Sequence, residues 1–121
     1  MDVEIKRESL YKMYDGSTES IIEVFDAFLD SEKEVVEDLD SAFSNADEST
    51  IRKQLHYHAP IFGYIGFPQV TLFIKDMENK YKNAVAAREK KLDHNELIST
   101  LKQVTSLLVI EKELMKTTAH A

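Results

Sequence analysis

Apolar residues recur along most of this chain at spacings of three and four, the period of one face of an α-helix. Three such runs cover about residues 17–46, 48–65 and 68–84, and a fourth continues past residue 97. Within the first run, Asp30-Ser31 is expected to form a joint or kink. The segment 9–14 predicts a shorter helix. The third run shows the stripe most clearly, with Val70, Ile74, Met77, Tyr81 and Ala84 on one face.

Turn and cap residues separate these runs. Asp15-Gly16-Ser17 predicts a turn followed by a helix cap, and Asp47 predicts a cap before the second run. Pro68 suits the first turn of the third run, after a break at Gly66-Phe67. The segment from Asp93 to Glu96 has the spacing of a capping box, so the last helix is expected to begin there, with His94 solvated at its cap.

Four long amphipathic segments with short links predict an all-α fold, an antiparallel up-and-down four-helix bundle with an additional short N-terminal helix. The 121 residues fit a single domain, 1–121, with an ordered core at about 8–116. Only three Gly and two Pro occur, which favours helices over turn-rich β folds. The C-terminal residues, with His120, are expected to fray.

Charge and composition narrow the function classes. A net charge of −7 argues against nucleic acid and anionic membranes as partners. No apolar run approaches the roughly 20 residues of a membrane span, and the N-terminal residues do not resemble a signal peptide. The chain has no cysteine, which excludes disulfides, thiolate metal sites and thiol catalysis. We therefore expect a cytoplasmic monomer with no membrane or nucleic-acid partner.

The segment 48–65 places two histidines on opposite faces of one helix. At about 100° per residue, the residues in one narrow sector form a core stripe, and they are Ile51, Leu55, His58, Phe62 and Ile65. His58 is therefore expected to face the core with a hydrogen-bond partner. His56 lies on the opposite side and is expected to face solvent.

The surroundings of His56 are unusual for a helix. Arg52 and Lys53 precede it by one turn, and Ala59, Pro60 and Gly63 follow on the same predicted outer face. Pro and Gly cost about 3 and about 1 kcal/mol relative to Ala in a helix interior. Two interpretations stay open: a partner approaches this surface closely, or Pro60 kinks the helix and Gly63 accommodates a neighbouring loop.

The segment from Leu55 to Gly66, with Val70, resembles the signature of histidine-containing phosphotransfer (HPt) domains of two-component phosphorelays. In that family the acceptor histidine is followed by a small residue four positions later and an apolar residue nine positions later. A Gly stands ten positions after the histidine, and another apolar residue stands fourteen positions after it. With His56 as acceptor, these positions hold Pro60, Ile65, Gly66 and Val70. The family also carries a Glu or Gln twenty-two positions after the acceptor, bonded to its ring, and Glu78 stands there. The likeness covers about residues 10–115.

The resemblance implies a phosphocarrier rather than a true enzyme. It implies that His56 accepts the phosphoryl group and that Glu78 orients its ring. Its implied partners are response-regulator receiver domains and a histidine kinase, and it implies no cofactor or metal in this chain, with Mg²⁺ on the receiver. Phosphoryl-stabilising charges are expected from Arg52, Lys53 and Lys75, and partner docking from Ala59, Pro60, Gly63, Gly66 and Phe67.

Two departures from the HPt pattern leave alternatives open. Ala59 stands where the family usually has Lys, and His58 stands where it has an apolar residue. A degenerate HPt-like adaptor that docks a receiver or kinase without carrying phosphate is therefore the alternative. A metal site on His56 and His58 is disfavoured, because the two side chains diverge by about 200° on a helix. An acid–base pair of Glu78 and His56 could serve hydrolysis, but nothing marks a substrate pocket.

Overall fold

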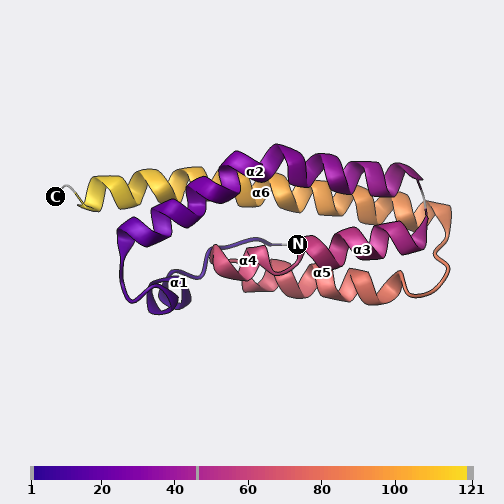
Figure 1. Cartoon of the computed structure of the whole chain (residues 1–121), viewed down its shortest axis with the longest axis horizontal. Coiled ribbons are helices and arrows are strands. Elements are labelled where there is room, and N and C mark those ends of the chain that lie inside the picture. Colours follow the sequence, from indigo (N-terminus) through magenta and orange to yellow (C-terminus); the bar gives the residue numbers. More distant parts are fainter. Residues whose placement is uncertain (1, 46, 120–121) are drawn as a thin grey trace.

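The computed structural model of this chain describes residues 2–45 and 47–119, and these residues form helices and connecting segments without a β-strand. The expected all-helical fold is confirmed for them, whereas His120 lies outside the described residues. No helix among them is both long and apolar enough to cross a bilayer. In chain order (Figure 1) the helices are α1 (Arg7–Met13), α2 (Thr18–Asn45), α3 (Glu48–His58), α4 (Ile61–Tyr64), α5 (Pro68–Lys80) and α6 (Ala87–Ala119).

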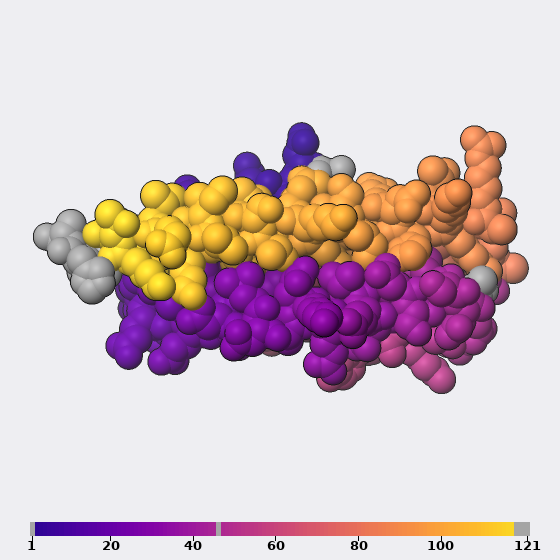
Figure 2. Space-filling view, turned by 90° about the horizontal axis from the view of Figure 1, so that it is seen from above, coloured from indigo at the N-terminus to yellow at the C-terminus, as the bar shows by residue number. Residues whose placement is uncertain are grey.

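The helices pack around one apolar core. The long helices α2 and α6 lie side by side along the molecule (Figures 1 and 2), while α3 packs against both α5 and α2. The rings of Phe28 and Phe62 meet edge to face, with centroids 5.7 Å apart. All members of the stripe predicted for 48–65 are buried, His58 included. Helical periodicity therefore assigned the inner face of this segment correctly.

Three helix starts follow the predicted caps. The Asp47 carboxylate accepts a hydrogen bond from the Ser49 backbone N–H at 3.3 Å, and the Ser17 hydroxyl accepts from Ser20 N–H at 3.2 Å. Pro68 occupies the first turn of α5. The Thr50 hydroxyl, which donates to Asp47 at 2.7 Å, is the main reason why the pKa of Asp47 lies below its usual value.

Two expected features in the first half of the chain differ in outcome. Helix α2 runs unbroken through Asp30-Ser31, so no joint separates two helices there. The Ser31 hydroxyl donates to the Phe28 carbonyl of the same helix at 3.1 Å, a bond of the kind that often bends a helix, so the expected kink is not contradicted. The segment 48–65 is not one helix, because Pro60 separates α3 from α4. Proline has no N–H to continue the helix, and its ring crowds the carbonyl four residues earlier.

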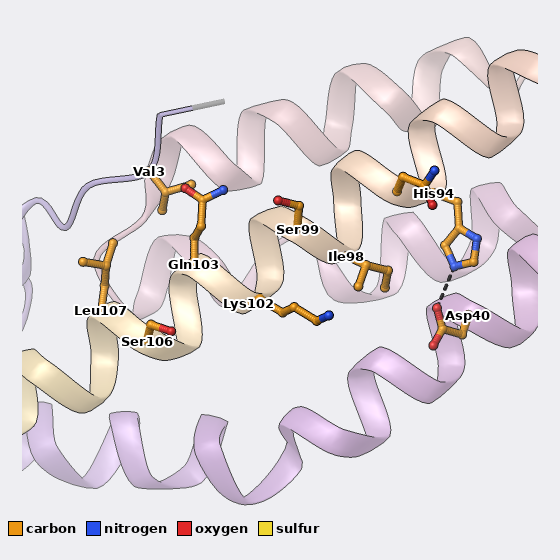
Figure 3. A pocket seen from close by; sticks show the side chains of 10 residues that line it. Val3, Asp40, His94, Ile98, Ser99, Lys102, Gln103, Ser106 and Leu107 are labelled. Atoms are coloured by element: carbon orange, nitrogen blue, oxygen red, sulfur yellow. Dashed lines mark hydrogen bonds and ion pairs between the residues drawn. The ribbon is translucent and has the colours of Figure 1, made fainter.

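The connection between α5 and α6 also differs from expectation. Helix α5 ends at Lys80, so Ala84 lies exposed in the connecting segment instead of in a stripe. Helix α6 begins at Ala87, so the predicted capping box at Asp93 is wrong. His94 is inside α6, where its Nε2 lies 2.6 Å from Asp40 Oδ1 (Figure 3) and its ring stacks on Phe43 at 5.0 Å. It is not a solvated cap, because it joins α6 to α2.

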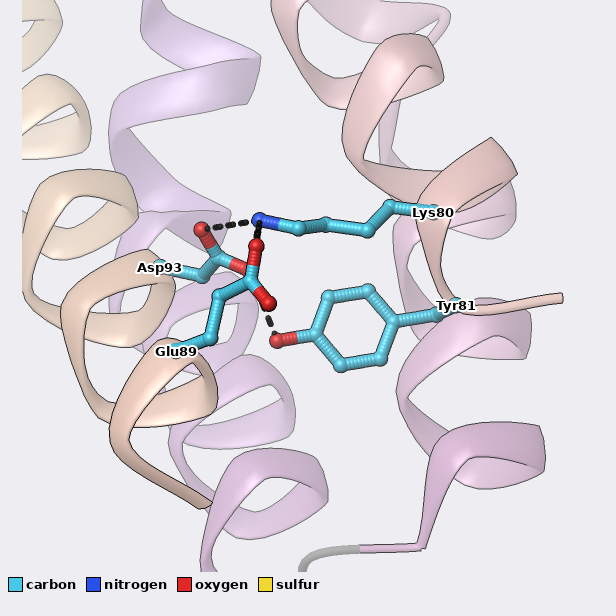
Figure 4. Close-up of polar contacts among 4 residues, drawn as sticks. All are labelled: Lys80, Tyr81, Glu89 and Asp93. Atoms are coloured by element: carbon cyan, nitrogen blue, oxygen red, sulfur yellow. Dashed lines mark hydrogen bonds and ion pairs between the residues drawn. The ribbon is translucent and has the colours of Figure 1, made fainter. Parts of the chain in front are cut away.

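Asp93 is buried and holds donors from the end of α5 (Figure 4). The Tyr81 hydroxyl donates to Asp93 Oδ2 at 2.9 Å, and Lys80 Nζ donates to both carboxylate oxygens at 3.0 and 3.1 Å. Lys80 also pairs with Glu89 at 2.7 Å. A buried carboxylate needs such partners, so Asp93 is used for tertiary contact instead of helix capping. Burial, followed by the Asp93 contact, raises the pKa of the Tyr81 phenol above its ordinary value.

The raised pKa of Tyr81 predicts a loss of stability in alkali. The unfolded chain releases this phenolic proton near pH 10, about the ordinary tyrosine value, while the folded protein retains it. The free energy of unfolding should therefore fall as the pH rises above about 10, and Tyr81→Phe should reduce that fall. Near neutral pH the same variant should lose about 1–3 kcal/mol, because Asp93 loses a donor.

Urea unfolding at a series of alkaline pH values measures both effects. The pKa of Lys80, raised mainly by Glu89, adds a loss of the same sign, so the comparison is between the slopes of wild type and variant. Tyr57→Phe, which removes an exposed hydroxyl, is the control. Equal alkaline slopes for wild type and Tyr81→Phe would contradict the assignment.

Candidate functional site

His56 lies on the outer face of α3, and α5 supplies its partner. Its Nδ1 is 2.9 Å from Glu78 Oε1. The His56 side chain is 79% exposed, whereas that of Glu78 is 18% exposed. The contact predicted from the HPt resemblance is therefore present: a largely buried carboxylate holds an exposed imidazole.

This contact determines which ring nitrogen of His56 is available. A carboxylate accepts a hydrogen bond, so the neutral ring carries its proton on Nδ1. Nε2 then keeps its lone pair, on a side chain that is mostly in solvent. The same division of roles, with one nitrogen fixed and the other reactive, operates in catalytic triads.

The other two described histidines also pair with carboxylates, but differently. His58 Nε2 lies 3.2 Å from Asp38 Oδ2, and its side chain is 8% exposed, which confirms the expected core-facing histidine with a partner. The His94 side chain, paired with Asp40 through Nε2, is 28% exposed. In the His58 and His94 pairs the carboxylate contacts Nε2. The nitrogen without a carboxylate partner is then Nδ1, which lies close to the main chain. Among the described histidines, His56 alone combines an exposed ring with a free Nε2.

Three cationic side chains were expected near the acceptor. Arg52 and Lys53 lie on α3 one turn before His56, and Lys75 lies on α5 almost one turn before Glu78. Within the described residues, neither Arg52 nor Lys75 forms an ion pair. No described carboxylate therefore pairs with either charge, and both can form charge-assisted hydrogen bonds to an anionic group.

The residues expected to dock a partner divide between surface and interior. Pro60 is exposed and Gly63 is partly exposed, whereas Ala59, Gly66 and Phe67 are buried. The expected outward orientation of Ala59 is wrong. Its backbone stays helical, with φ −56° and ψ −45°, and its N–H donates to the Leu55 carbonyl at 3.0 Å. Four residues along a helix, Ala59 lies only about 40° around the axis from the buried Leu55, so its small side chain is buried with the core stripe.

Thr71 on α5, which the sequence analysis missed, satisfies the backbone at this break. Its hydroxyl donates to the Ala59 carbonyl at 2.6 Å and accepts from the Gly63 N–H at 3.0 Å. A Cβ on Gly63 would lie 3.7 Å from the Thr71 hydroxyl oxygen. Thr71 precedes Glu78 by seven residues, two helical turns, so periodicity on α5 could have placed both toward α3 and α4.

Gly66 accommodates the N-terminal segment of the chain. Its φ is +96°, and an added Cβ would lie 3.0 Å from Ile5 Cγ1. Its carbonyl accepts a hydrogen bond from Lys6 N–H at 2.8 Å. Gly66 nevertheless borders the same cavity, of about 360 Å³, as Pro60, Gly63 and Lys75. The structure thus brings four of the expected site residues to one hollow beside α4.

Across the part of the chain that the structure describes, no group of three or more His, Asp or Glu residues is placed to hold a metal ion. No family model, curated protein or solved structure matches this chain. The site geometry and the likeness of the His56 segment to the HPt signature are therefore the two observations that bear on function.

The Glu78 contact predicts the tautomer of His56. At alkaline pH, where imidazole is neutral, long-range ¹H–¹⁵N spectra should show the His56 proton on Nδ1. Glu78→Ala should move the proton to Nε2, whereas Glu78→Gln should preserve the tautomer, because its amide oxygen still accepts. Asp76→Ala, at an exposed position of the same helix, is the matched control. A wild-type ring protonated on Nε2 would show that the contact does not form in solution.

Proposed function

We propose that this protein is a phosphorelay intermediate. His56 accepts a phosphoryl group from the phosphorylated aspartate of a receiver domain, or from a hybrid kinase, and passes it to another response regulator. The observation that carries this proposal is Glu78 Oε1 at 2.9 Å from Nδ1 of an exposed His56. The HPt resemblance supports this proposal. We also propose that the helices form an antiparallel four-helix bundle, as the sequence pattern predicts.

The proposed step is a displacement at phosphorus. The lone pair of His56 Nε2 attacks the phosphorus of the receiver acyl phosphate, an N–P bond forms, and the P–O bond to aspartate breaks, so that the aspartate leaves as a carboxylate. The ring becomes a phosphoimidazolium that keeps its Nδ1 proton. Glu78 accepts that proton's hydrogen bond and offsets the positive charge of the ring. Transfer to the next receiver is the reverse reaction, with Mg²⁺ supplied by the receiver, as the resemblance implies.

Cationic side chains on α3 and α5 favour phosphoryl carriage over a histidine that is exposed without a function. Arg52 and Lys53, with Lys75 from α5, supply the positive charge that phosphoryl oxygens need. Ala59, which stands where the family usually has Lys, removes a positive charge. This instead favours the second candidate, an adaptor that docks a receiver or kinase without accepting phosphate.

Phosphotransfer to purified protein tests the proposal. A panel of phosphorylated receiver domains should transfer labelled phosphate to the wild type, giving an alkali-stable and acid-labile product. His56→Gln should abolish labelling, because the nucleophile is removed. Glu78→Ala should slow it roughly ten- to hundred-fold, the equivalent of losing a charge-assisted hydrogen bond of about 1.5–3 kcal/mol.

Substitutions of the other paired histidines provide the controls. His94→Gln and His58→Gln should accept label as the wild type does, provided that circular dichroism shows them folded. Labelling that persists in His56→Gln but disappears in folded His58→Gln would show that the wrong histidine was assigned. If receivers bind the wild type but transfer no label to it, the protein is an adaptor instead of a phosphocarrier.

A further inference from the structure

A second hollow lies on the other side of α3 from Glu78, between α2 and the α3–α4 segment. Its volume is about 470 Å³. The walls combine buried apolar residues with two exposed tyrosines, Tyr57 at 75% and Tyr64 at 56% exposure. The lining includes Phe28, Glu34, Val35, Asp38, Tyr57 and Tyr64. We refer to this hollow as the α2–α3 groove.

The charge of the α2–α3 groove is negative. Glu34 and Asp38 contribute carboxylates from α2, and no lysine or arginine lines the groove among the described residues. Asp38 is bonded to the buried His58. Glu34 is exposed and forms no ion pair in the described part of the chain. An apolar floor beneath two carboxylates and two tyrosine rings is complementary to a cation carried on an aliphatic stem.

The α2–α3 groove adjoins the proposed phosphoacceptor. Tyr57 directly follows His56 and is the more exposed of the two tyrosines. Its ring meets the His58 ring edge to face at 4.9 Å. Going around α3, the surface therefore passes from Glu78 to His56, then to Tyr57 and the groove. This path spans about one helix diameter, roughly 10 Å. An ordinary contact of about 800 Å² per partner covers both features at once.

We propose that the α2–α3 groove holds a lysine or arginine side chain of the receiver domain that docks over His56. This inference rests on the proposed function and adds to it the chemistry by which the partner is recognised. The aliphatic stem lies against Phe28 and Val35, and the cationic head lies between Glu34 and Asp38. The rings of Tyr57 and Tyr64 flank the head, where their faces attract a cation.

Charge reversal at Glu34 tests the proposal without altering the acceptor. Using a receiver that transfers phosphate to the wild type, Glu34→Lys should raise the KM for the phosphorylated receiver about five- to ten-fold. The maximal transfer rate should not change, because His56 and Glu78 are untouched. Raising the salt concentration should weaken binding of the wild type more than that of Glu34→Gln, since salt screens the attraction that this variant lacks.

Glu23→Lys is the matched control. Glu23 is exposed on the same helix, eleven positions earlier and so about 16 Å away, and the substitution changes the net charge equally. If the KM rises equally in Glu23→Lys and Glu34→Lys, or rises in neither variant, the groove proposal is overturned. The proposal of phosphotransfer through His56 is unaffected by either result. Receiver binding without transfer, weakened selectively by Glu34→Lys, supports the groove and overturns carriage. If no receiver binds or transfers, both proposals fail.

Discussion

The apolar stripe of α3 packs between α2 and α5, and the side chains on the outer face of α3 take their direction from that packing. Residues such as Ile51 and Leu55 are fully buried, and each contributes about 1.5–3 kcal/mol by leaving water. One hydrogen bond to an exposed ring contributes about 0.5–1.5 kcal/mol. Packing therefore determines where His56 points, and the weaker Glu78 contact selects its tautomer.

Three histidine–carboxylate pairs join different pairs of helices, and burial separates their chemistry. His58 joins α3 to α2 and His94 joins α6 to α2, both through Nε2. These two contacts occupy the outer nitrogen of partly or wholly buried rings, as expected of structural links. His56 is bonded through Nδ1 and is open to solvent. Two of the three histidine–carboxylate pairs thus hold helices together, and the third presents a histidine that can react with a partner.

The surface around α3 has charges of both signs. Arg52 and Lys53 lie on the turn before His56, while Glu34 and Asp38 border the α2–α3 groove on the other side of Tyr57. In the proposed complex, the first pair faces phosphoryl oxygens and the second faces a cation of the receiver. Opposite charges about a helix diameter apart would orient the partner as well as attract it, and such complementarity contributes mainly to specificity and association rate.

The sequence by itself determined the helical class, the inner stripe of α3 and the outward face of His56, because these follow from a local period of 3.6 residues. The resemblance added Glu78, whose contact with His56 the structure contains. Only the tertiary structure decided that Asp93 holds Tyr81 and Lys80 and that Thr71 spans the break at Pro60. It also decided that Ala59 is buried. A polar side chain near a helix end can satisfy its own backbone or a neighbouring helix, and only the packing of that neighbour determines which donors lie within reach.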